Sequence, residues 1–180
     1  NRANHAVRHA RHGFHVDHQF PKPGILFYDI TSVLAHPQAF KYCIDAMVEL
    51  YKGQDLDAVA AVESRGFLFA APFAERLGLP ILLVRKKGKL PGKTRSMKYT
   101  LEYGEAEIEM HETDIPAGGR VLIVDDLIAT GGTLRATADL LVQGGAVPVG
   151  VFGVIGLPFL KYSDVLKDLD VRVLIEYFGE

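Results

Sequence analysis

Short apolar runs and segments of helical spacing follow one another along most of the chain. Continuous apolar and β-branched runs are typical of strands covered on both faces, and they predict strands over residues 57–62, 80–85, 121–124, 147–155 and 171–177. Apolar residues three and four positions apart predict helices over 38–52, 66–77 and 134–142, with a further helical connection near 163–169. This alternation predicts a doubly wound α/β fold, in which helices flank a mainly parallel sheet on both sides.

The segment between residues 85 and 110 departs from this alternation. Residues 99–103 and 106–110 alternate between apolar and polar side chains on either side of a glycine, which predicts a β-hairpin. Seven lysines and arginines crowd residues 85–98, where two glycines and a proline interrupt regular structure. Because loops of this length in compact domains are often lids, we expect residues 86–98 to close over an anionic ligand.

The N-terminal region is less informative. Two prolines make residues 20–24 a rigid turn, and the apolar run 25–30 predicts a short strand. Five histidines lie within residues 1–19, three of them at helical spacing. We favour a solvent-exposed or frayed helix there over a metal site.

Composition narrows the classes of function. A chain of 180 residues that is 48% hydrophobic can form a single domain, 1–180, with a sizeable core. The net charge of −2 argues against bulk electrostatic binding to nucleic acid or to a membrane surface. No apolar run reaches the length of a membrane span, and no signal-peptide pattern opens the sequence. The only cysteine, Cys43, is expected to be a packed side chain and fits a reducing, cytoplasmic location.

The chain is organised around residues 121–133, which read Val-Leu-Ile-Val-Asp-Asp-Leu-Ile-Ala-Thr-Gly-Gly-Thr. We expect the strand to end at the acidic pair Asp125 and Asp126, which needs hydrogen-bonding partners such as vicinal ribose hydroxyls. The small, hydroxylated loop and the following helix N-terminus suit a phosphate dianion; the loop consists of Ala129, Thr130, Gly131, Gly132 and Thr133. The segment lacks both the lysine of a P-loop and the pattern G-x-G-x-x-G, so it predicts a sugar-phosphate site, with an ordinary strand-to-helix turn as the alternative.

A second loop, residues 63–66, joins a predicted strand to a predicted helix and reads Glu-Ser-Arg-Gly. An arginine beside a helix N-terminus is a natural contact for pyrophosphate, because the guanidinium binds two oxygens and the helix amides are free. The alternative is a surface ion pair within the turn.

The segment 121–133 resembles the phosphoribosyl-pyrophosphate (PRPP) motif of the type I phosphoribosyltransferases. Further segments resemble the members of that family that act on adenine, namely residues 20–31, 63–70, and 85–92 with 99–109, so that the resemblance covers roughly residues 20–178. It implies the type I fold, with a small N-terminal hood near 20–31 and a flexible catalytic lid and hairpin over 85–110. It also implies a purine-salvage reaction in which adenine and PRPP, with Mg²⁺ as cofactor, give AMP and pyrophosphate. A homodimer without nucleic-acid or membrane partners is expected.

The resemblance further implies roles for individual residues. Glu102 would be the acid/base, whereas the sequence by itself leaves Glu105 and Glu107 as alternatives. Arg65 and Lys89 would stabilise the leaving group. Ribose and the 5′-phosphate would be bound by Asp125, Asp126 and residues 129–133.

Two further groups of residues complete the implied site. Pyrophosphate would be bound by a loop with a non-proline cis peptide and by nearby cations, together Glu63, Ser64, Arg65, Arg85 and Lys89, with Arg85 acting across a dimer interface. Adenine would be bound by the ring of Phe27 and by backbone groups near Leu26 and Tyr28. Mg²⁺ would be held through PRPP and water, without a direct side-chain ligand. Many relatives have a basic residue where Tyr28 stands, which leaves the role of that side chain open.

Two other functions are compatible with the same PRPP motif. One is phosphoribosyl transfer to a 6-oxopurine. The other is regulatory PRPP binding, as in purine repressors, although 180 mildly acidic residues leave little room for an added DNA-binding domain.

Overall fold

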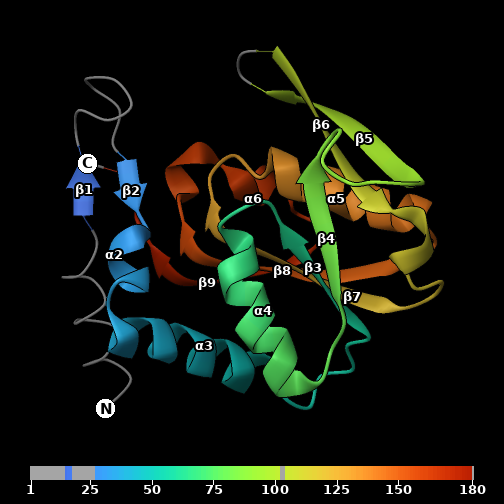
Figure 1. Ribbon diagram of the computed structural model, residues 1–180. Coiled ribbons are helices and arrows are strands. Elements are labelled where there is room, and N and C mark those ends of the chain that lie inside the picture. The colour runs from blue at the N-terminus through green and yellow to red at the C-terminus, as the bar shows by residue number, and fades with distance from the viewer. Residues whose placement is uncertain (1–14, 18–26, 102–103, 180) are drawn as a thin grey trace. The chain divides into compact units, whose positions relative to one another are not determined.

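The computed structural model describes residues 15–17, 27–101 and 104–179 of the chain (Figure 1). The chain divides into two compact units, residues 1–49 and residues 50–180. In the first unit, strand β1 (His15–Asp17) pairs antiparallel with β2 (Phe27–Asp29). Helix α2 (Thr31–Leu34) follows, and helix α3 (Pro37–Tyr51) runs from the first unit into the second.

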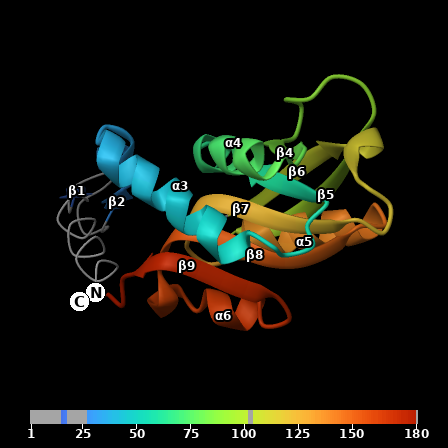
Figure 2. The ribbon, with the colours of Figure 1, turned by 90° about the horizontal axis from the view of Figure 1, so that it is seen from below.

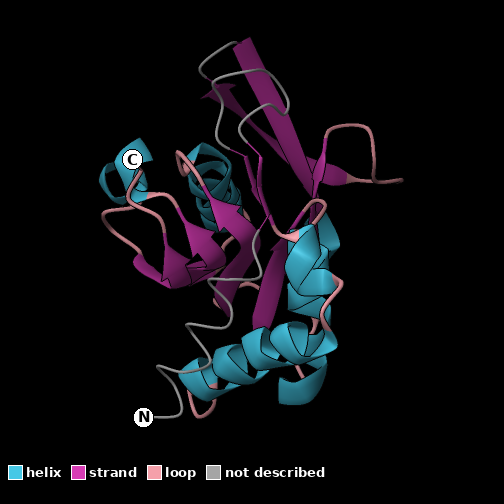
Figure 3. Cartoon of the chain, turned by 90° about the vertical axis from the view of Figure 1, so that its left-hand side faces the viewer, coloured by secondary structure: helices cyan, strands magenta, loops and turns pink. Residues whose placement is uncertain are grey.

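The second unit is built on a seven-stranded sheet of order β5-β6-β4-β3-β7-β8-β9. Five strands are parallel, namely β3 (Ala58–Val62), β4 (Ile81–Lys86), β7 (Arg120–Ile128), β8 (Val147–Gly156) and β9 (Asp170–Glu176). The other two, β5 (Thr94–Leu101) and β6 (Gly104–His111), form an antiparallel hairpin on the edge next to β4. Figure 3 shows this hairpin projecting from the sheet.

Helices cover both faces of the sheet (Figure 2). Helix α4 (Gly66–Leu77) connects β3 to β4, and helix α5 (Gly132–Gln143) connects β7 to β8 on the opposite face. Short helical turns complete the connections, namely η1 (Glu112–Asp114), η2 (Pro158–Leu160) and α6 (Tyr162–Val165). The predicted doubly wound, mainly parallel architecture is therefore confirmed.

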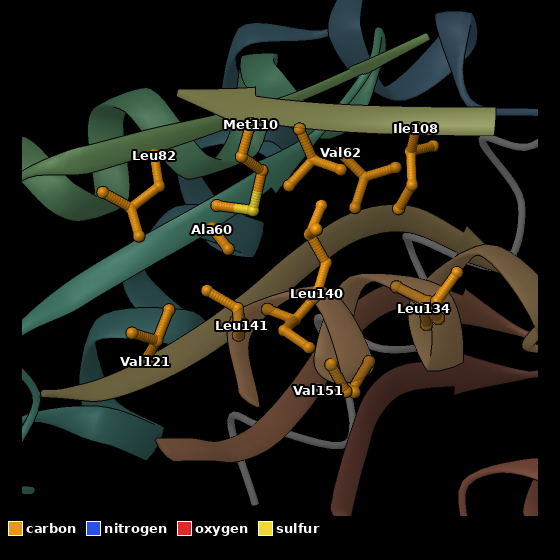
Figure 4. Packing of buried hydrophobic residues seen from close by; sticks show 14 of the residues in the cluster. Ala60, Val62, Leu82, Ile108, Met110, Val121, Leu134, Leu140, Leu141 and Val151 are labelled. Carbon is orange, nitrogen blue, oxygen red and sulfur yellow. The ribbon is translucent and has the colours of Figure 1, made fainter. Parts of the chain in front are cut away.

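The core follows from the period-two geometry of the strands. All of β3 is buried, and its alternate residues Ala58, Ala60 and Val62 belong to one cluster with Leu134 and Leu141 of α5 (Figure 4). Successive side chains of a strand point to opposite faces, so a strand covered on both sides has no polar face. The small alanines of β3 allow the helices to approach the sheet closely.

The predicted elements of the second unit are found close to their expected bounds, with two differences. The strand expected to end at the acidic pair continues through Asp125 and Asp126 to Ile128. It does so because Asp125, Leu127 and Ile128 still pair with β8. The helical connection near 163–169 is shorter than expected, since α6 ends at Val165.

The lid and the N-terminal segment also differ from the predictions. Residues 94–98 lie in β5, so the irregular loop is limited to residues 87–93. Residues 15–17 form a strand rather than part of a frayed helix, because they pair with β2; the rest of residues 1–19 lies outside the described residues.

Cys43 is buried, as predicted, and burial raises the pKa of its thiol to about 11. In the described part of the chain, no helix is long and apolar enough to cross a membrane.

Candidate active site

The loops that follow β3 and β7 meet at the carboxyl ends of these two adjacent parallel strands. They enclose a hollow of about 270 Å³, lined by Glu63, Ser64, Arg65, Lys86, Asp125, Asp126 and Leu127. Ligands of doubly wound proteins bind at this edge of the sheet. The structure thus brings together the acidic pair and the Glu-Ser-Arg loop, which lie sixty residues apart in the sequence.

Gly66 allows this close approach. A Cβ atom at this position would lie 2.9 Å from the carbonyl oxygen of Val124 and 3.1 Å from Oδ1 of Asp125. Both partners belong to β7, where the carbonyl has no freedom to move away. Any larger residue at position 66 would therefore push the start of α4 away from the acidic pair.

The two carboxylates of the acidic pair have different surroundings. The side chain of Asp126 is buried, and its Oδ2 lies 2.7 Å from Nε of Arg65, whose side chain is 42% exposed. This Oδ2 nevertheless accepts no hydrogen bond from any described residue, so charge alone holds the pair together. The backbone N–H of Asp126 donates to Oδ1 of Asp125 at 2.8 Å. Burial, and then the negative charge of Asp126, raise the pKa of Asp125 well above its ordinary value.

Both helices that begin at this edge lack a side-chain cap at the N-terminus. Neither Arg65, which precedes α4, nor Gly131, which precedes α5, makes a side-chain cap hydrogen bond. The first amides of a helix have no partner within the helix, and the helix dipole favours an anion beside them. At the start of α4, the N–H groups of Phe67 and Leu68 donate to the carbonyls of Ser64 and Arg65. The positive ends of two helix dipoles thus flank the acidic pair, one at each loop.

The loop before α5 depends on a left-handed residue. Gly131 has a φ of 83°, a conformation that residues with a side chain rarely adopt. The turn aims the start of α5 along the sheet edge, where the hydroxyl of Thr133 donates to the hydroxyl of Tyr99 at 3.1 Å. Tyr99 lies on β5, so the hairpin contacts the predicted phosphate loop.

The loop after β3 is tied to the end of β4. The Glu63 carboxylate accepts hydrogen bonds from Nε of Arg85 at 3.2 Å and from the backbone N–H of Lys86 at 2.9 Å. Desolvation acts to raise the pKa of Glu63, but the Lys86 amide and then Arg85 outweigh it and lower this pKa. The peptide bond between Glu63 and Ser64 is cis, as the resemblance implies for this loop.

Lys89 lies on the exposed loop 87–93 that follows β4. Its backbone N–H donates to Oε1 of Glu109 at 2.9 Å, and its carbonyl accepts from Nη1 of Arg85 at 3.2 Å.

Sequence reasoning missed Glu109, because the acidic residues of the hairpin alternate in the same way and only their hydrogen-bonding partners distinguish them. It also missed Tyr99 and the hollow-lining Leu127 as site residues, and it places Lys86 only in the cationic segment 86–98, not in the hollow.

The residues predicted to bind adenine and to transfer the proton are not among the described residues that line the hollow. Leu26 and Glu102 fall outside the described residues. Phe27 and Tyr28 lie on β2, in the first unit, and form register pairs with Asp17 and Val16 of β1. Among the described residues, no group of three or more histidine, cysteine, aspartate or glutamate side chains is placed to hold a metal ion.

Comparisons with known proteins show which family the chain is similar to. The family described as "Phosphoribosyl transferase domain" matches residues 29–156. The adenine phosphoribosyltransferase of Treponema denticola is 61% identical over 161 residues, which cover 89% of this chain and 85% of that protein. The crystal structure of adenine phosphoribosyltransferase from Thermoanaerobacter pseudethanolicus has a TM-score of 0.91 at 42% identity, covering 95% of this chain and 99% of that chain.

A third relative was solved with ligands. The Saccharomyces cerevisiae adenine phosphoribosyltransferase, complexed with D-2,5-dideoxy-2,5-imino-altritol 1,6-bisphosphate and adenine, has a TM-score of 0.89 at 36% identity. The match covers 96% of this chain and 99% of that chain.

Proposed function

Because this chain belongs to the adenine phosphoribosyltransferases, a branch of the type I phosphoribosyltransferase family, we propose that its site transfers the 5-phosphoribosyl group of PRPP to adenine. The products are AMP and pyrophosphate, which makes the reaction a purine-salvage step. The observation that carries this function is the acidic pair of β7 between two uncapped helix N-termini. PRPP offers complementary chemistry, since its ribose hydroxyls lie between a 5′-phosphate and a pyrophosphate.

We assign the ribose and the 5′-phosphate to the end of β7 and the start of α5. The side chains of Asp125 and Asp126 both line the hollow, and their carboxyl groups can accept hydrogen bonds from the ribose hydroxyls. Residues 129–133 can donate amides and threonine hydroxyls to the 5′-phosphate. Thr133 would then exchange its bond to Tyr99 for one to the phosphate, or share it.

We assign the pyrophosphate to the loop after β3 and to the cations around it. As the anomeric C–O bond breaks, negative charge grows on pyrophosphate, and Arg65 and Lys89 stabilise that charge. A carboxylate would repel pyrophosphate, so Glu63 contributes through its backbone, beside Ser64, and by holding Arg85 in place. Within this chain, Arg85 donates to the Glu63 carboxylate and to the Lys89 carbonyl; we further propose that it acts across a dimer interface.

Mg²⁺ is the proposed cofactor. Magnesium keeps several waters and binds substrate phosphates, so we expect it to be held through PRPP and water, without a direct side-chain ligand from this chain. When bound through PRPP and water, it neutralises charge on the leaving pyrophosphate. The chain's own carboxylates then orient the ribose.

Base recognition and proton transfer are assigned to the segment around β2 and to the hairpin. We propose that Phe27 and backbone groups near Leu26 and Tyr28 bind adenine. Glu102 takes up the proton that adenine loses as N9 attacks the anomeric carbon, with Glu105 and Glu107 as the alternatives. The yeast relative was crystallised with adenine, which supports adenine as the base.

We also propose that the protein acts as a homodimer in the cytoplasm. Strand β4 alternates, with Leu82 and Val84 buried and Ile81 and Leu83 37% and 40% exposed. An outer sheet face with two exposed apolar side chains beside Arg85 suits a subunit interface. The cytoplasmic location rests on the single cysteine and on the metabolic role.

The function is tested by supplying PRPP and Mg²⁺ with adenine, hypoxanthine or guanine in turn and measuring nucleotide formation. A backbone carbonyl and amide that read the 6-amino group and N1 of adenine would meet an oxo group and an N1–H in hypoxanthine. Because both contacts would be mismatched in a closed pocket, kcat/KM for adenine should exceed that for the other bases by at least about 10³. Comparable turnover of hypoxanthine would favour a 6-oxopurine enzyme, and PRPP binding without turnover would favour a regulatory protein.

A further inference from the structure

A buried carboxylate outside the hollow binds the loop that carries Lys89. Glu109, on β6, has only 1% of its surface exposed. Its Oε1 accepts hydrogen bonds from the backbone N–H groups of Lys89 and Leu90, each at 2.9 Å. Its Oε2 accepts one from the Thr94 hydroxyl at 3.0 Å and lies 3.3 Å from Nζ of Lys87. All four partners belong to the loop 87–93 or to the residue that follows it.

The sheet topology explains why one residue can hold the whole loop. Strand β6 lies between β4 and β5, so the chain must cross the end of β6 to pass from β4 to β5. Glu109 is the residue of β6 that pairs with Arg85 on one side and with Ser96 on the other. Its carboxylate therefore lies where the loop crosses, and binds it at the start, the middle and the end.

The energetics show that the carboxylate is held ionised. Burying a charge is costly unless hydrogen bonds and opposite charges compensate. Desolvation acts to raise the pKa of Glu109, but the bonds from Leu90, Thr94, Lys89 and Lys87 outweigh it and lower this pKa to about 2. The full negative charge thus stays beneath a loop rich in lysine.

The backbone of Lys89 is bound on both sides. Its N–H donates to Glu109, while its carbonyl accepts from Arg85, which in turn binds Glu63. The Lys89 charge also contributes to the lowered pKa of Glu63, so it acts on the loop assigned to pyrophosphate. A fixed backbone with an exposed side chain is the arrangement needed to aim one cation at a ligand.

From these contacts we infer that Glu109 is a positioning residue, which fixes the loop 87–93 through its backbone so that Lys89 faces the leaving pyrophosphate. The inference rests on the proposed function, because it assigns pyrophosphate to Lys89. It adds a residue that touches no substrate, and it predicts that Glu109 acts on catalysis only through Lys89.

A double-mutant cycle tests this dependence. Glu109→Ala should lower kcat/KM for PRPP at least about tenfold in the parent protein, since small displacements of a positioning group are costly in rate. In the Lys89→Ala background the same change should cost less than about twofold. Glu112→Ala is the matched control, because Glu112 pairs with Arg95 on the same hairpin and its side chain does not bind the loop. It should leave kcat/KM within about twofold of the parent.

Hydrogen exchange provides a readout that does not depend on activity. In Glu109→Ala, exchange should be faster in residues 87–93 and unchanged in β3, β7 and α5. If that variant fails to fold, Glu109→Gln replaces it in both measurements; one oxygen remains for the two amides, so its effects should be smaller and in the same direction.

The outcomes separate this inference from the proposed function. Equal losses from Glu109→Ala in both backgrounds, or unchanged exchange in the loop, would overturn the positioning role. If Lys89→Ala alone left kcat/KM unchanged, the pyrophosphate assignment itself would fail, whatever the exchange experiment showed.

Discussion

At the residue scale, the site depends on two neighbouring carboxylates that are kept close despite their charge. Asp126 is balanced by Arg65, whereas Asp125 receives one backbone N–H and is otherwise desolvated. The repulsion between the two neighbouring charges lowers the stability of the folded state. In the proposed function, the same pair of carboxylates binds the ribose. Function and stability therefore oppose each other at Asp125.

This opposition predicts that Asp125→Asn stabilises the ligand-free protein at neutral pH. The pKa of Asp125 is raised in the folded state, so its contribution to stability is fully present below the unfolded pKa of about 4 and is lost as pH rises through the folded pKa. Asn carries no charge at either pH. The variant should melt at least about 2 °C higher than the parent at pH 7. The difference in melting temperature between the variant and the parent should disappear near pH 4. The variant should also turn over PRPP more slowly than the parent.

The melting temperatures are measured without ligand at both pH values. A parent protein that melts higher than the variant at pH 7 would show that the Asp125 charge is better compensated than the structure indicates.

Asp126→Ala is expected to raise the KM for PRPP more than tenfold. Losing hydrogen bonds to a charged group costs roughly 1.5–3 kcal/mol, and the Asp126 carboxylate, which lines the hollow, is assigned to the ribose. Asp139→Ala serves as the control, because Asp139 pairs with Arg135 on α5 outside the hollow. Initial rates at varied PRPP measure the effect; an unchanged KM would remove Asp126 from the ribose site.

At the element scale, the irregular loop 87–93 joins two regular strands and is held from below by Glu109. The hairpin that follows is attached to the start of α5 through Tyr99 and Thr133. Side-chain hydrogen bonds, and not backbone pairing alone, thus connect the loop 87–93, the β5–β6 hairpin and helix α5. Such bonds can exchange partners when a ligand arrives.

We expect amide hydrogen exchange across residues 87–93 to slow when PRPP and Mg²⁺ bind. Most of this loop is exposed, and pyrophosphate would add contacts to its cations. Mass spectrometry with and without ligand measures the change, and the buried strand β3 serves as the internal reference. Equal exchange of the loop in both states would contradict its assignment as a lid.

At the scale of the whole molecule, the outer face of β4 is apolar where it meets solvent. Ile81 and Leu83 are exposed there, and Leu68 on α4 is 47% exposed. Single exposed apolar residues are common, but because two lie on one strand we propose that this face is the subunit interface. The hollow-lining cation Lys86 and Arg85 follow on the same strand.

Leu83→Lys should therefore convert the proposed dimer into a monomer. A buried lysine without a partner charge is costly at an interface core. Val142→Lys is the matched control, since Val142 is an exposed apolar residue on α5. Sedimentation velocity measures the mass of each. A parent protein that sediments as a monomer, or a Leu83→Lys variant that remains dimeric, would place the interface elsewhere or exclude it.

The sequence by itself determined the fold class, and it predicts the phosphate-binding loop. Apolar runs such as 121–124 need burial on both faces, and helices between parallel strands are the available solution. The acidic pair and the glycine–threonine loop lie within eight residues of each other, so the sequence shows that they belong to the same strand-to-helix connection, although the strand continues past the pair to Ile128. The loop around Arg65 was predicted for the same reason.

Only the tertiary structure decided which distant residues act together. Gly66 shows how the loop after β3 comes into contact with Asp125, because its missing side chain leaves room for β7. Glu109 could not be distinguished from Glu105 and Glu107 by alternation, since what sets it apart is the loop that crosses above it. The pattern of hydrophobic and polar residues along a helix or strand indicates which of its faces is buried. Contacts between elements depend on strand order and register, which arise only when the whole sheet has formed.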